Sequence, residues 1–168
     1  LPFPGWQKMV AFFFFFCILS YGIGPICLLA LRKIQPEQRR PFKLLGSLFF
    51  CNIAFYVCNL MLYWCGFSVI WKLCLAILFG FIIYLCYQKR NFWSGNYSLY
   101  WFFSYITVLL LLSYLGPFGG IARLKFPFGM LIIFPFSLLM LYLSQYCLVR
   151  DQAEKESFDL MNKQLQDL

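Results

Sequence analysis

Long apolar runs separated by short polar connections dominate the pattern along the chain. Nearly uncharged stretches cover about residues 9–31, 44–64, 69–87, 99–115 and 130–149. Each is close to the ~20 residues with which a helix crosses the ~30 Å hydrocarbon core of a bilayer. Periodicity gives little guidance, because lipid on one side and protein on the other select a helix that is apolar all round. The pattern predicts an all-α, polytopic membrane protein with about five transmembrane helices.

The amino-acid composition argues against a soluble protein. The chain is 62% hydrophobic and only 12% charged, with a mean hydropathy of +0.75. A soluble domain of 168 residues could not cover so much apolar surface with so few polar side chains. Residues 1–149 are therefore expected to form a membrane domain, with membrane lipid as its solvent.

The basic residues indicate the orientation of these spans. If every span crosses fully, one side of the membrane collects ten Lys and Arg: Arg32, Lys33, Arg39, Arg40, Lys43, Lys89, Arg90, Arg150, Lys155 and Lys163. The other side holds four, namely Lys8, Lys72, Arg123 and Lys125. The positive-inside bias then places the N-terminus outside and the C-terminus in the cytoplasm. Orientation and anionic lipid account for the net charge of +8, and no nucleic-acid partner is expected.

A polar stripe follows the second apolar stretch. Asn52, Tyr56, Asn59 and Tyr63 are spaced by four, three and four residues, which aligns their side chains along one face of a helix. Hydrogen bonds between helices are the favoured interpretation, and the lining of a solute path is the alternative.

The last nineteen residues change composition abruptly. They place Phe158, Met161, Leu165 and Leu168 at helical spacing opposite a mostly polar face. We expect residues 150–168 to form an amphipathic cytoplasmic tail that lies on the membrane surface, docks on a partner or stays exposed.

The residue types argue against catalysis and against a metal centre. The chain has no His, its eight Cys form no CxxC pair, and all six acidic residues fall on the predicted cytoplasmic side. Zinc sites and acid–base chemistry at membrane depth need such groups, so we expect no metal, no cofactor and no enzyme activity. The segment "GPFGG" at 116–120 lacks the spacing of a phosphate-binding loop and is expected to be a turn.

Three segments near the N-terminus carry a family resemblance. They read "PFPGWQKMV" at 2–10, "SYGIGPICLLALRK" at 20–33 and "PEQRRPFK" at 36–43. The most specific positions are Arg32, Lys33, Pro36, Arg40, Pro41 and Phe42. They resemble the end of the tenth helix and the following cytoplasmic loop of bacterial permeases of the amino acid, polyamine and organocation (APC) family. In physical terms, the cations and Pro36 stop one helix, and Arg40 and Pro41 set the entry of the next.

The resemblance implies a fold and a role. APC permeases are built from two inverted five-helix repeats and hold substrate at broken helices near the membrane midplane. Those helices would precede Leu1, and a chain that begins with Leu instead of Met fits either a piece of a longer protein or an unusual start codon. The expectation is the C-terminal part of an amino acid permease that carries amino acids or related amines only together with its N-terminal helices. Its partners would be the rest of the permease or an oligomeric partner.

Two other functional classes stay open at this point. The chain could be a small membrane scaffold or accessory subunit that binds another membrane protein through its polar stripe or tail. A membrane enzyme such as a quinone-linked thiol oxidoreductase is disfavoured, because CxxC and His are absent.

Overall fold

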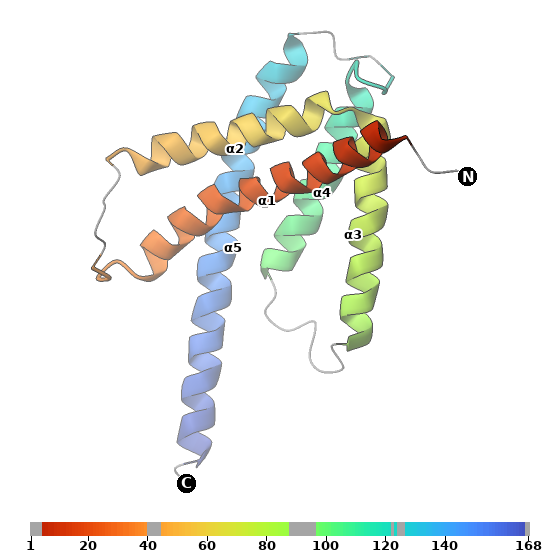
Figure 1. Ribbon diagram of the computed structural model, residues 1–168. Helices are drawn as coiled ribbons and strands as arrows, with labels where there is room; N and C mark the ends of the chain where they lie inside the picture. Colours follow the sequence, from red (N-terminus) through yellow and green to blue (C-terminus); the bar gives the residue numbers. More distant parts are fainter. Residues whose placement is uncertain (1–4, 40–44, 88–96, 122, 124–126, 167–168) are drawn as a thin grey trace.

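The computed structural model describes residues 5–39, 45–87, 97–121, 123 and 127–166. These residues form five α-helices and the turns that join them, so the all-α prediction is confirmed (Figure 1). The helices are α1 (Trp6–Ile34), α2 (Ser47–Trp64), α3 (Phe67–Tyr87), α4 (Tyr97–Leu115) and α5 (Phe128–Gln166).

All five helices are long and apolar enough to cross a membrane. The apolar spans extend over Phe13–Ile34, Ser47–Trp64, Phe67–Cys86, Tyr97–Leu115 and Phe128–Glu154. Helix α5 has 39 residues and continues without a break from its apolar part into the polar tail. The apolar face expected from Phe158 onward lies outside the residues whose side chains are described.

The helices form two layers (Figure 1). Helices α1 and α2 lie side by side and antiparallel, and this pair crosses in front of α4 and α5. Helices α3, α4 and α5 run up and down behind it, with α4 next to α5 and α3 next to α4. The side chains between the layers are almost fully buried and include Phe15, Phe55, Leu62, Ile70 and Leu141.

Two turns meet at the end of the bundle where α2 and α4 finish. The backbone N–H of Phe67 donates to the carbonyl of Phe118, at 3.0 Å. Gly66 makes this contact possible: its φ is +87°, and a β-carbon there would lie 2.6 Å from the same carbonyl oxygen. Residues 116–120 form the turn that the sequence predicted, in which Gly119 has a φ of +81°. The contact places these two connections on one side of the molecule, as alternating spans require.

Candidate functional site

The polar stripe of α2 faces α5, and Asn59 is its most buried member. Asn59 is 1% exposed, its amide nitrogen donates to the Ser137 hydroxyl at 3.1 Å, and its amide oxygen accepts from Tyr105 at 2.6 Å. Ser137 in turn donates to the carbonyl of Ile133, at 2.8 Å. One side chain of α2 is thus hydrogen-bonded to both α4 and α5, deep in an environment where unpaired polar groups are costly.

Stacked aromatic rings hold Tyr105 in place. The ring of Tyr105 lies between Trp101, at 5.5 Å and 9° between planes, and Phe136, at 6.0 Å and 6°. The indole N–H of Trp101 donates to the carbonyl of Met140, at 2.8 Å. Because the Tyr105 ring is stacked on both faces and the Trp101 ring is itself held by its hydrogen bond, the Tyr105 hydroxyl has little freedom to find another acceptor.

Tyr63, one turn further along α2, fills a space that only glycine leaves open. A β-carbon on Gly116 would lie 2.8 Å from the Tyr63 hydroxyl oxygen, and a β-carbon on Gly129 would lie closer still. The hydroxyl is buried and has no hydrogen-bond partner among the described residues. Tyr63 therefore binds α2 to the ends of α4 and α5 by shape and by its edge-on contact with Phe118, at 5.8 Å.

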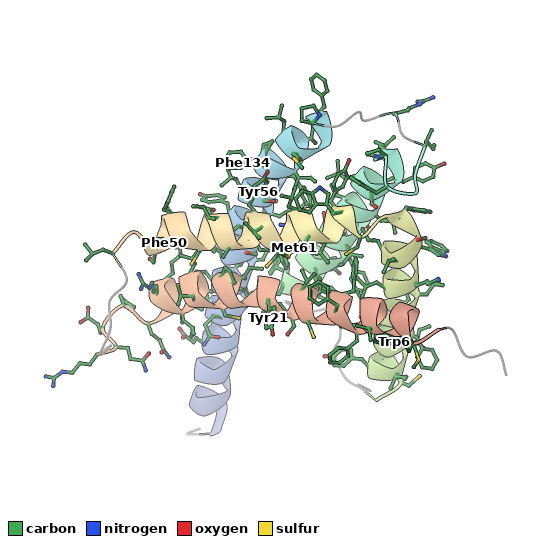
Figure 2. All side chains as sticks on the ribbon, turned by 45° about the horizontal axis from the view of Figure 1, so that its top comes forward. Trp6, Tyr21, Phe50, Tyr56, Met61 and Phe134 are labelled. Carbon is green, nitrogen blue, oxygen red and sulfur yellow. The ribbon has the colours of Figure 1, made fainter. Side chains whose placement is uncertain are left out.

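The other two members of the stripe are only half-buried. Tyr56 meets Phe134 of α5 edge-on, with ring centroids 5.4 Å apart (Figure 2). Asn52 lines a groove of about 700 Å³ between the α1–α2 pair and α5. All four residues of the predicted stripe thus lie toward α5, and Asn59 is the member that pairs with two other helices.

The basic loop motif lies partly within the described residues. The Arg32 guanidinium donates to the hydroxyl of Ser47 and so links the end of α1 to the start of α2. The Lys33 ammonium lies 5.8 Å from the centre of the Tyr142 ring on α5. Pro36 stands in an exposed turn directly after α1. Arg40, Pro41 and Phe42 lie outside the described residues.

Asp151 is a structural residue that the sequence reasoning missed. It is 8% exposed, and its carboxylate accepts from the backbone N–H of Tyr97 at 2.8 Å and of Ser98 at 2.9 Å, as well as from the Ser98 hydroxyl. Next to it, the Arg150 guanidinium lies 4.4 Å from the centre of the Tyr97 ring. The carboxylate caps the start of α4 from another helix, where the helix dipole favours negative charge. Only its place directly after an apolar span hinted at this role.

Replacing Asp151 by alanine is expected to loosen the start of α4. The substitution leaves orphan N–H groups at Tyr97 and Ser98, and losing an N-terminal cap costs about 0.5–2 kcal/mol. Hydrogen exchange followed by mass spectrometry should show faster exchange at the first turn of α4. The exposed Glu156, changed to glutamine, is the control and should leave that exchange unchanged. Equal exchange in the Asp151→Ala protein and the wild type would contradict the cap.

The described side chains pack against one another and form hydrogen bonds, and they do not gather into a cluster of reactive groups. The eight cysteines are free thiols, and Cys51, Cys58, Cys65 and Cys74 pack in or against the apolar core. Within the described ranges, no three His, Cys, Asp or Glu side chains gather into a group that could hold a metal ion. The buried polar groups near the middle of the spans are amides and hydroxyls, which can join helices without carrying charge.

The chain is similar in sequence to two known transporters. It is 31% identical over 158 residues to the aspartate-proton symporter of Bacillus subtilis, a match that covers 87% of this chain and 29% of the symporter. It is 29% identical over 143 residues to the glutamate/serine transporter AimA of the same organism, covering 82% of this chain and 26% of AimA. No family model and no solved structure matches the chain.

Both relatives are amino acid transporters. Together with its five apolar helices, this similarity supports a multi-pass membrane protein that is related to transporters. The chain spans less than a third of the length of either relative.

Proposed function

We propose that the chain is the C-terminal membrane part of an amino acid permease of the APC family, a secondary transporter of the bacterial inner membrane. The observation that carries the proposal is the similarity to the aspartate-proton symporter over 87% of the chain. The names of the two relatives favour an acidic amino acid as the substrate, with serine as the alternative. The excess of Lys and Arg after α1 supports an external N-terminus and a cytoplasmic C-terminus.

In this proposal the five helices support the transport core and do not themselves hold the substrate. Asn59, the most buried polar member of the α2 stripe, is engaged by Tyr105 and Ser137 within the chain. The Asp151 carboxylate is likewise occupied by the start of α4. A site for a charged amino acid needs partners for its carboxylate and ammonium groups, and these would come from the remaining helices of the transporter.

Helix α1 offers the face on which those helices would pack. Ser20, Tyr21, Gly24 and Leu28 are all exposed along α1, and a β-carbon on Gly24 would meet nothing within 4 Å. Small residues let transmembrane helices approach closely, so a serine and a glycine one turn apart favour a helix as the neighbour. The relatives supply candidates, because more than two thirds of their length lies outside the match.

A pair of glycine substitutions tests this function. Gly24→Leu should lower the uptake of labelled aspartate and glutamate by the native gene product about tenfold to a hundredfold, since small displacements in a transport core are costly. Gly80→Leu on α3 is the matched control: Gly80 is exposed and also has open space around it. A β-carbon at either position would meet nothing within 4 Å, so both proteins should reach the membrane in equal amounts.

Two outcomes would contradict the proposal. If cells that produce the wild-type protein take up none of aspartate, glutamate and serine, transport of these amino acids is ruled out as the function. Equal uptake by the Gly24 and Gly80 variants would show that the α1 face takes no part in the transporter.

A further inference from the structure

A groove on the surface of the bundle is not explained by the proposed transport role. It has a volume of about 700 Å³ and lies between the α1–α2 pair and α5. Its wall on α5 runs from Pro135 to Gln145, and Leu48 and Asn52 form the wall on α2. The volume falls within the range of about 300–1,000 Å³ that is usual for sites that hold a small molecule.

The groove has the length of one membrane leaflet. Ten residues of helix rise about 15 Å, which is half of the ~30 Å hydrocarbon core. Most of its side chains on α5 are leucines, among them Leu138, Leu139 and Leu143. A leucine-lined groove of this length suits a hydrocarbon chain better than it suits a polar solute.

Polar groups gather at one end of the groove. Lys33 lines it and holds its ammonium 5.8 Å from the centre of the Tyr142 ring. Lys33 ends α1 and adjoins the connection that carries Arg39, Arg40 and Lys43 in the sequence. The excess of basic residues assigns this end to the cytoplasmic surface, where anionic lipid head groups lie.

We propose that the groove binds an anionic phospholipid of the inner leaflet. One acyl chain lies along the leucines of α5, and the phosphate accepts a charge-assisted hydrogen bond from the Lys33 ammonium. Basic pockets between transmembrane helices on the cytoplasmic side are suited to such head groups. A zwitterionic lipid would fill the same groove but gain less from the surrounding positive charge.

Photo-crosslinking tests the site on the native gene product reconstituted in vesicles. The probes are phosphatidylglycerol and phosphatidylcholine that carry the same photoactivatable acyl chain. We expect adducts within residues 135–145 and about a fivefold preference for phosphatidylglycerol, which corresponds to about 1 kcal/mol for one basic residue. Lys33→Gln should abolish the preference. Lys72→Gln on α3, which removes an exposed positive charge away from the groove, should keep it.

A second pair of variants tests whether the lipid chain occupies the groove, independently of the charge of Lys33. Leu139→Trp should fill the groove and reduce adducts from both probes, whereas Leu131→Trp, at an exposed position of α5 outside the groove, should not. Equal labelling by the two probes in the wild type would mean ordinary lipid contact and would overturn the proposal. Absence of adducts in residues 135–145 would mean that another part of the protein covers the groove, and would overturn it as well.

Discussion

Replacing Asn59 by leucine is expected to lower the free energy of unfolding by about 1–3 kcal/mol. The substitution removes the acceptor of the Tyr105 hydroxyl, which stacking between Trp101 and Phe136 keeps in place. Ser137 loses a donor but keeps its own bond to the Ile133 carbonyl, so the cost falls mainly on Tyr105. Thermal unfolding in mild detergent, followed by circular dichroism, measures the loss.

Two further variants make this result specific. Asn52→Leu is the same change on the same helix at a half-buried position that lines the groove, and it should cost less. In a protein that also carries Tyr105→Phe, the Asn59→Leu substitution should cost less stability, because no tyrosine hydroxyl is left without its acceptor. The double-mutant cycle formed by these variants measures the coupling energy between the two residues. An Asn59→Leu protein as stable as the Asn52→Leu protein would show that the buried network contributes nothing to stability.

Replacing Gly129 by alanine is expected to destabilise the bundle by about 1–3 kcal/mol, the usual cost of overpacking. The new β-carbon would overlap the Tyr63 hydroxyl, which is already enclosed between Gly116 and Gly129. Tyr63→Phe alone should be neutral or slightly stabilising, because the hydroxyl it removes is buried and has no partner among the described residues. The same unfolding assay measures both variants.

A double variant shows whether Gly129→Ala destabilises the protein through overlap with Tyr63 or through a cost of alanine that does not depend on Tyr63. Gly129→Ala together with Tyr63→Phe should recover part of the lost stability, since the substitution removes the closest overlap, that with the hydroxyl oxygen, while the ring carbon that carried it still lies 2.9 Å from the new β-carbon. Gly80→Ala, in open space on α3, is the control and should cost nothing. If the Gly129→Ala protein is no more stable with Phe at position 63, the contact of Tyr63 with Gly129 is not what makes the glycine necessary.

The helices could be predicted from the sequence because the bilayer sets their length and excludes charge. The stretch expected at 44–64 appears as Ser47–Trp64, and the one expected at 99–115 appears as Tyr97–Leu115. The same reasoning aligned Asn59 with its neighbours on one face of α2. Side-chain spacing within one helix is a local property, so it can be read directly from the residues.

The arrangement of the helices could not be predicted in this way. An apolar residue is acceptable to lipid and to protein alike, so no pattern showed that α1 and α2 would cross α5 or that Tyr63 would enter the space beside Gly129. The cap by Asp151 joins residues more than fifty positions apart and leaves no sequence motif. The groove likewise exists only where two layers of helices cross.

The mass of the native gene product in membranes, detected through a tag placed after Leu168, tests most directly whether this chain works as part of a longer permease. The account predicts a band several tens of kDa above the 19.9 kDa of these 168 residues. A band near 19.9 kDa would contradict it. That result would instead favour a small accessory subunit, to be identified by a partner that co-purifies in fixed stoichiometry.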